Sequence, residues 1–156
     1  MRLLCVFNEQ EVEADIDLLS LREFSAIAKS KRFEFDWLVE AQNHVYKIFL
    51  IESGLILGLI SLIDMPHELR VNINLIEISS ENVGKKKEYD RIAGCLIAFA
   101  AKTAFMQGYN GFVSLLPKTQ IIDLYCDRYG FQQYGRYLAV EGTSAISLIQ
   151  TYLKHD

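Results

Sequence analysis

Cysteine, proline and histidine are scarce in this sequence of 156 residues, which contains three cysteines, two prolines and three histidines. Cys5, Cys95 and Cys126 are odd in number and far apart, which excludes a disulfide framework and the paired spacing of a zinc site. The histidines form no i, i+4 metal pair, and no Gly-x-Ser-x-Gly motif accompanies them, which disfavours a hydrolase triad. We expect a cytoplasmic protein without a bound metal.

The sequence also lacks a long uninterrupted apolar run and an excess of positive charge. Its most apolar stretch, residues 48–63, contains Glu52 and two glycines and is too short for a membrane span. Residues 3–7 are apolar, but an acidic segment follows them, so no signal peptide is expected. The net charge of −4 and the pI of about 5.4 argue against a nucleic-acid or anionic-membrane partner.

The composition is sufficient for a folded hydrophobic core. Hydrophobic residues make up 51% of the sequence and charged residues 23%, which is typical of a globular protein. The length predicts one domain, residues 1–156, and there is no internal repeat, low-complexity tract or linker.

The apolar pattern predicts alternating strands and helices. Two segments are ambiguous: residues 31–40 fit an extended segment or a short helix, and residues 144–153 fit a last helix or a strand with a helical tail. Ser53-Gly54 is expected to be a two-residue hairpin turn, and Gly108 to end the middle helix. Strands are expected at residues 1–7, 45–52, 55–64, 71–79, 112–116 and 131–141, and helices at 15–29, 90–107 and 119–129.

The order of these elements predicts the sheet. Three consecutive strands within residues 45–79 form an antiparallel meander, and the strand–helix–strand unit over residues 71–116 requires a crossover and a parallel pair. The fold class is therefore α/β (α+β), with a mixed, mostly antiparallel sheet flanked by helices. In the strand at 71–79, alternation puts one set of side chains on each face: Ile73, Leu75 and Glu77 on one, and Asn74, Ile76 and Ile78 on the other.

The loop that follows this strand is a candidate phosphate site. It is rich in Asn, Gly and Lys and opens into an apolar helix, whose free first-turn N–H groups and positive dipole end attract anions. Gly84 would allow close backbone approach, residues 85–87 are three lysines, and residues 91–94 would supply N–H groups. The alternative is a solvated turn whose lysines face water.

The element order resembles that of the GCN5-related N-acetyltransferase (GNAT) superfamily. The strand Leu75-Ile-Glu-Ile78, the loop and the helical Ile92-Ala-Gly-Cys-Leu-Ile97 resemble the family's acetyl-CoA motif. Residues 112–116 resemble its fifth strand, and Tyr125-Cys-Asp-Arg-Tyr-Gly-Phe131 resembles its helix that ends in Gly-Phe. The resemblance covers roughly residues 44–141.

The sequence departs from the family pattern at three places, which indicates a divergent member. Glu88 stands where Arg or Gln is usual, and Arg91 where Gly is usual. The loop is longer, with its lysines upstream. Tyr125 lies one residue further from Gly-Phe than is usual, and Tyr129 is a second aromatic residue in the same turn.

By resemblance, the protein would transfer an acetyl group from acetyl-CoA to a primary amine by direct attack in a ternary complex, without a metal. A backbone N–H near Ile78 would hold the oxyanion. The residues expected to bind acetyl-CoA are Ile76, Ile78, Asn82, Gly84, Lys85, Lys86, Lys87, Tyr89, Arg91, Ile92, Ala93, Gly94 and Lys118.

Two residues are the catalytic candidates. By resemblance, Glu77, on the strand that in the family faces both the cofactor and the acceptor amine, would accept the proton of the amine, directly or through water; the alternative is a carboxylate that is paired locally or exposed. Glu81 is its nearby competitor. By resemblance, Tyr125 would protonate the thiolate of CoA, a role suited to a phenol; the alternative is a core aromatic.

A second hypothesis is that the chain is a catalytically silent GNAT-like module that binds CoA or a protein partner, which the departures at Glu88 and Arg91 favour. A homodimer is a further expectation.

Overall fold

The computed structural model describes residues 1–117 and 122–154, and this part of the chain forms one mixed sheet of nine strands in the order β6-β1-β2-β3-β4-β5-β7-β9-β8. Only the neighbours β5 and β7 are parallel, which confirms the predicted crossover and fold class. The elements are β1 (Arg2–Cys5), β2 (Glu11–Leu18), α1 (Leu21–Ser30), η1 (Trp37–Glu40), β3 (His44–Leu50), β4 (Ile56–Met65), η2 (Pro66–Glu68), β5 (Arg70–Ile78), η3 (Ser80–Asn82), β6 (Tyr89–Asp90), α2 (Ile92–Met106), β7 (Val113–Leu115), α3 (Ile122–Tyr129), β8 (Gln132–Tyr134), β9 (Tyr137–Val140) and α4 (Gly142–Tyr152), where η marks a 3₁₀ helix.

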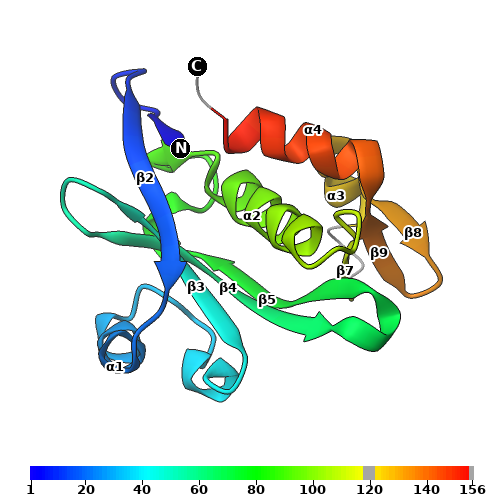
Figure 1. Ribbon diagram of the computed structural model, residues 1–156. Helices are drawn as coiled ribbons and strands as arrows, with labels where there is room; N and C mark the ends of the chain where they lie inside the picture. Colours follow the sequence, from blue (N-terminus) through cyan, green and yellow to red (C-terminus); the bar gives the residue numbers. More distant parts are fainter. Residues whose placement is uncertain (118–121, 155–156) are drawn as a thin grey trace.

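Each face of the sheet carries its own hydrophobic core. Figure 1 shows α2 and α4 side by side on one face, with α3 close to them, and α1 on the other face. The larger core lies between the sheet and α2, and the smaller core packs α1 and η1 through Phe24, Ile27 and Trp37. Because α2 also packs against α4, its all-round apolar character is explained by burial on two sides. In the described part of the chain, no helix has the length and apolar composition that crossing a membrane requires.

The N-terminal helix begins later than the sequence pattern predicted. Residues 11–18 form the strand β2, and α1 begins only at Leu21. Ser20 is its N-cap, in a capping box with Glu23, so the predicted helix start at residue 15 was wrong. Apolar and acidic residues alternate along residues 11–17, which is a strand period.

One predicted turn and one predicted strand were also wrong. The β3–β4 link comprises residues 51–55 and is not a two-residue turn; Gly54 has a φ of 75° there. Residues 131–141 form the hairpin β8–β9 in place of a single strand, with Gly135 at the turn (φ 59°). Each loop bends through a glycine at positive φ, a conformation that costs other residues free energy. The two ambiguous segments are settled as η1 and α4.

A β-bulge at Asn74 interrupts β5. Pairing with β4 shifts register there, so that one extra residue stands between two cross-strand pairs: Leu62 with Ile73, and Ser61 with Leu75. The Asn74 side chain donates to Glu40 Oε1 (2.6 Å) in η1, on the face of the smaller core.

The bulge makes the predicted faces of β5 partly wrong. Ile73 packs in the larger core together with Ile76 and Ile78, whereas Leu75 contacts the smaller core. One extra residue reverses the alternation of a strand, so Ile73 does not share a face with Leu75 and Glu77. Before Asn74, the odd-numbered side chains of β5 face the larger core; after Asn74, the even-numbered side chains do.

Candidate functional site

An open strand edge forms where β5 and β7 diverge. The two strands pair only over residues 71–73 and 113–115, and β5 continues to Ile78 with no other described strand on that side. The N–H of Ser79 donates to Leu57 O in β4 (2.9 Å). Because backbone groups alternate between the two sides of a strand, the N–H groups of Ile76 and Ile78 point toward the open edge.

The loop after β5 is fixed at both ends by Asn82. Its buried side chain donates from Nδ2 to Ser79 Oγ (2.9 Å) and accepts at Oδ1 from the Tyr89 N–H (2.9 Å). Tyr89 and Asp90 form the short strand β6, which pairs with β1. Asn82 therefore organises the loop from inside it. Gly84 lies at the loop tip with a φ of 85° and open space around it.

The first turn of α2 presents uncapped N–H groups. Arg91 occupies the N-cap position, and its side chain makes no capping hydrogen bond. The first intrahelical bond there runs from the Cys95 N–H to Arg91 O (3.0 Å), which leaves the N–H groups of residues 92–94 without partners in the helix. Arg91 has a φ of 80°, so this position keeps the left-handed conformation that suits the glycine usual in the GNAT motif.

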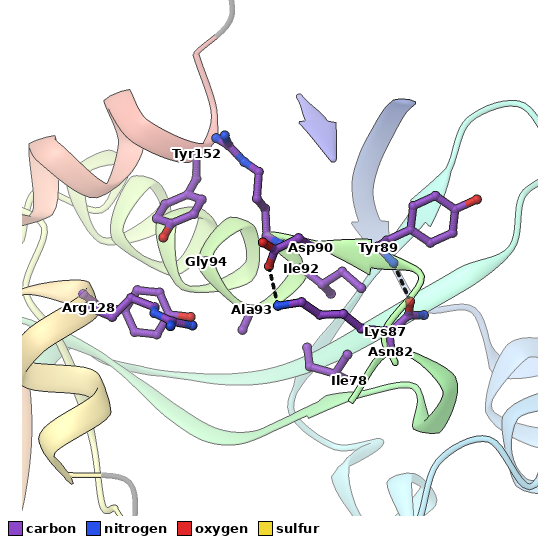
Figure 2. A pocket seen from close by; sticks show the side chains of 12 residues that line it. Ile78, Asn82, Lys87, Tyr89, Asp90, Ile92, Ala93, Gly94, Arg128 and Tyr152 are labelled. Atoms are coloured by element: carbon purple, nitrogen blue, oxygen red, sulfur yellow. Dashed lines mark hydrogen bonds and ion pairs between the residues drawn. The ribbon is translucent and has the colours of Figure 1, made fainter. Parts of the chain in front are cut away.

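A cavity of about 300 Å³ lies in front of this turn. Figure 2 shows its side chains converging from the end of β5, the loop and α2. The structure brings together eight of the predicted donor-site residues, all of which line the cavity: Ile78, Asn82, Lys87, Tyr89, Arg91, Ile92, Ala93 and Gly94. Four others, Ile76, Gly84, Lys85 and Lys86, do not line it, and Lys118 lies outside the described residues.

Four residues that the sequence reasoning did not assign to the donor site also line the cavity: Asp90, Arg128, Tyr129 and Tyr152. The sequence contained one indication of Tyr129, which is the second aromatic residue before Gly-Phe. It contained no indication of Tyr152, because that residue reaches the cavity only through the packing of α4 against α2.

The cavity has net positive charge. Lys87, Arg91 and Arg128 contribute three cations and Asp90 one carboxylate. Asp90 accepts from Lys87 Nζ (2.9 Å) and from the Arg91 N–H (2.8 Å), and the hydrogen bond from Lys87 is the main cause that lowers the pKa of Asp90. Among the described residues, no carboxylate forms an ion pair with Arg128.

Tyr152 covers the first turn of α2. A Cβ on Gly94 would overlap the Tyr152 ring, so Gly94 allows this close packing. The Arg91 guanidinium lies over the same ring, 5.3 Å from its centroid, and Nη2 donates to Thr151 O. Arg91 Nε is buried without a partner among the described residues. The end of α4 is thus fastened to the start of α2.

Glu77 holds a different part of the molecule. Its carboxylate lies on the face of the smaller core and does not line the cavity. It accepts three N–H bonds from the segment after α1, from Glu34 N (2.6 Å), Trp37 Nε1 (2.8 Å) and Phe35 N (3.3 Å). Glu81 is ion-paired with Arg32. Burial raises the pKa of Glu81, but the hydrogen bonds that the carboxylate accepts, the strongest from Arg32, and the charge of Arg32 together outweigh this and lower the pKa overall.

Tyr125 lies in an aromatic cluster of the larger core. Its ring meets those of Tyr129 (5.5 Å) and Phe131 (5.4 Å) edge-on, and it does not line the cavity. Burial, followed by the neighbouring Tyr129, raises the pKa of Tyr125 to about 12. Of the two tyrosines in this turn, only Tyr129 reaches the cavity wall.

Tyr125→Phe should flatten the alkaline pH dependence of stability. The pKa of Tyr125 is about 12 in the folded protein and about 10 in an unfolded chain, so the unfolded chain loses this proton first and the free energy of unfolding falls as pH rises from about 10 to 12. Denaturant titrations at several pH values in this range measure the slope. Identical slopes for the variant and the wild type would contradict the prediction.

Comparisons with known proteins identify the fold. No protein-family model matches the sequence, and neither does a curated protein. The structure is similar to mutant forms of the spermidine/spermine N-acetyltransferase SpeG from Vibrio cholerae, at 13% identity over 86% of this chain and 96% of that chain, with a TM-score of 0.63.

Two further solved structures are similar over most of their length. The ribosomal-protein-S18-alanine N-acetyltransferase from Escherichia coli has 12% identity over 83% of this chain and 94% of its own, with a TM-score of 0.60. A GNAT family acetyltransferase from Brucella melitensis in complex with acetyl-CoA has 14% identity over 83% and 88%, with a TM-score of 0.53. The chain therefore has the fold of the GCN5-related N-acetyltransferases.

Proposed function

We propose that the protein is an N-acetyltransferase that transfers an acetyl group from acetyl-CoA to a primary amine by direct attack in a ternary complex. The observation that carries this proposal is the positively charged cavity at the uncapped start of α2, next to the open edge of β5. An anionic donor with an extended arm suits that pair of features. The similar fold of known acetyltransferases supports the same assignment.

In this proposal the diphosphate of the donor binds the N–H groups of residues 92–94, with Lys87 and Arg128 beside it. The pantetheine arm leaves the cavity along the open edge of β5 and takes the place of the missing strand. The thioester carbonyl, at the far end of the arm, accepts a hydrogen bond from a backbone N–H near Ile78, such as that of Ile76, which also stabilises the oxyanion.

The chemistry then needs two proton transfers. The amine nitrogen attacks the carbonyl carbon, a C–N bond forms, and the C–S bond breaks to release the thiolate of CoA. Glu77 is our candidate for accepting the amine proton, and its three N–H donors favour a relay through water over direct contact. Tyr125 is our candidate for protonating the thiolate, since its phenol is neutral at pH 7. The scheme uses no metal ion.

Acetyl-CoA should raise the melting temperature, because a ligand at about 100 times its Kd adds about 2.7 kcal/mol to the free energy of unfolding. Lys87→Ala should weaken binding by about 10- to 150-fold, since charged hydrogen-bond partners contribute about 1.5–3 kcal/mol. Lys86→Ala is the matched control, because Lys86 does not line the cavity. The absence of any shift at millimolar acetyl-CoA would overturn the assignment.

The second candidate is a module that binds CoA without turnover. It is favoured by the engagement of the Glu77 carboxylate with three N–H groups. Release of free thiol from acetyl-CoA in the presence of a panel of primary amines separates the two: amine-dependent release supports the enzyme, and binding without release supports the module.

A further inference from the structure

A separate cavity, of about 170 Å³, borders the C-terminal end of α2. We call it the rear cavity, and its lining residues are His44, Tyr46, Leu62, Asp64, Val71, Thr103 and Gln107. It shares no lining residue with the cavity in front of the first turn of α2. Because α2 has 15 residues and spans about 22 Å, the two cavities lie near opposite ends of this helix.

Asp64, in β4, supplies a carboxylate to the rear cavity. Its Oδ1 accepts a hydrogen bond from the OH of the buried Tyr109 (2.6 Å), and no cation in the described part of the chain forms an ion pair with it. The hydrogen bond to Asp64, followed by burial, raises the pKa of Tyr109, so the phenol remains the donor of this bond at pH 7. The carboxylate is therefore held in place, while its charge has no counterion among the described residues.

The end of α2 adds a second attraction for a cation. The last turn of this helix contains no basic residue, so no side chain of that turn compensates the negative end of the helix dipole. Thr103 and Gln107 line the rear cavity from this end. The Thr103 hydroxyl donates to Phe99 O (3.0 Å) and therefore offers only its lone pairs to a ligand. A carboxylate and a helix C-terminus thus border the same space, and both favour positive charge.

The rest of the lining suits a short hydrocarbon. Leu62 and Val71 are buried side chains that line the rear cavity from the sheet. Tyr46 lines it from β3, with its ring packed against Phe99 (4.7 Å), and an aromatic ring beside a cation is stabilising. The imidazole of His44 can accept one hydrogen bond in its neutral form. A volume of about 170 Å³ corresponds to about six water molecules, which leaves room for a small molecule only.

We propose that the rear cavity binds a small organic ammonium ion, such as a short-chain primary alkylammonium. The ammonium group donates hydrogen bonds to the Asp64 carboxylate and to Thr103 Oγ1, and the alkyl chain lies against the apolar side chains of the sheet. Among the described residues, no group of three His, Cys, Asp or Glu side chains could hold a metal ion, so an organic cation matches the lining better. This site does not depend on the proposed function, since it lies at the other end of α2.

Amide NMR titration of the full chain with propylammonium chloride tests the site, with sodium chloride used to keep the ionic strength constant. We expect saturable shifts centred on residues 62–64 and 103–109, with a Kd on the order of 1 mM or weaker for so small a ligand. The neutral analogue 1-propanol has the same length without the charge. It should give no saturable shifts at these residues.

Two variants and one control separate charge from shape. Asp64→Asn keeps an oxygen that accepts from Tyr109 but removes the charge, so the Kd for propylammonium should rise about tenfold or more. Thr103→Leu fills the rear cavity and should abolish the saturable shifts, and leucine is a good helix former. Asp15→Asn is the matched control, because Asp15 is exposed on β2 and lines neither cavity. Its Kd should equal that of the wild type.

The outcomes separate this inference from the proposed function. Equal Kd values for the wild type and Asp64→Asn would overturn the inference, as would equal binding of 1-propanol. Shifts confined to the surroundings of Glu77 would also overturn it, because the amine would then occupy an acceptor site, and the acetyltransferase proposal would stand. If propylammonium binds at Asp64 while acetyl-CoA does not bind the protein at all, the inference holds and the acetyltransferase proposal fails.

Discussion

Gly94→Ala should lower the free energy of unfolding by about 1–3 kcal/mol, the usual cost of overpacking a well-filled site. The added methyl group would overlap the Tyr152 ring, so α4 must move away from α2. The same displacement would disturb the contact of Arg91 with Thr151 O and should weaken acetyl-CoA binding. Denaturant unfolding measures the first effect, and titration with acetyl-CoA the second.

A double-mutant cycle identifies the cause. Tyr152→Leu removes the ring, so Gly94→Ala should cost much less in that background, and the two changes should couple by about 0.5–3 kcal/mol. An equal cost of Gly94→Ala in both backgrounds would show that the glycine serves something other than packing of the ring. In that case, close approach of a ligand to the helix would be the better explanation for Gly94.

Glu77→Gln should cost about 1–3 kcal/mol of stability, the penalty for leaving a hydrogen-bonding group without its partner. One amide oxygen can replace Oε1 and still accept from Trp37 Nε1. The amide NH₂ then faces the N–H of Glu34, which now donates to Oε2 at 2.6 Å, so two donors oppose each other. We also expect kcat to fall by about 100-fold or more if Glu77 moves the proton of the amine.

Trp37→Phe separates the structural from the catalytic effect. It removes one of the three donors to Glu77 but keeps the carboxylate. The variant should lose stability and retain most of kcat, whereas Glu77→Gln should lose both stability and kcat. If Glu77→Gln keeps kcat and loses only stability, Glu77 is a structural clamp of the segment after α1, and its catalytic assignment fails.

The central part of the fold could be predicted because each local signal agreed with the tertiary structure. Residues 71–116 read as strand, helix and strand, and Gly108 ends α2 with a φ of 86°. The strand at residues 11–18 was missed because its apolar positions, such as Ile16 and Leu18, also fit the helical spacing that continues into α1. The bulge at Asn74 has no local signal, since it depends on pairing with β4 and on the contact with Glu40.

The candidate site could likewise be predicted only in part. The loop and the first turn of α2 are contiguous in sequence, so Lys87 and Gly94 could be assigned from their order alone. Arg128 and Tyr152 come from helices that reach the cavity only through packing. Glu77 was a candidate because its strand resembles that of the family, but its partners lie about 40 residues away, at Glu34 and Trp37, and no local pattern could supply them.

The pairing of β6 with β1 has a consequence for how the protein folds. Leu4 pairs with Asp90, and the N–H of Val6 donates to Glu88 O, so the far end of the loop after β5 is closed by residues near the start of the chain. Bringing together residues so far apart in the sequence costs conformational entropy, and the short pairing of β6 with β1 offsets only part of that cost. Contacts of this kind are slow to form. We therefore expect the loop after β5 to acquire its structure late, after the β3–β4–β5 meander, so that binding of a ligand at this loop would be a sensitive indicator of complete folding.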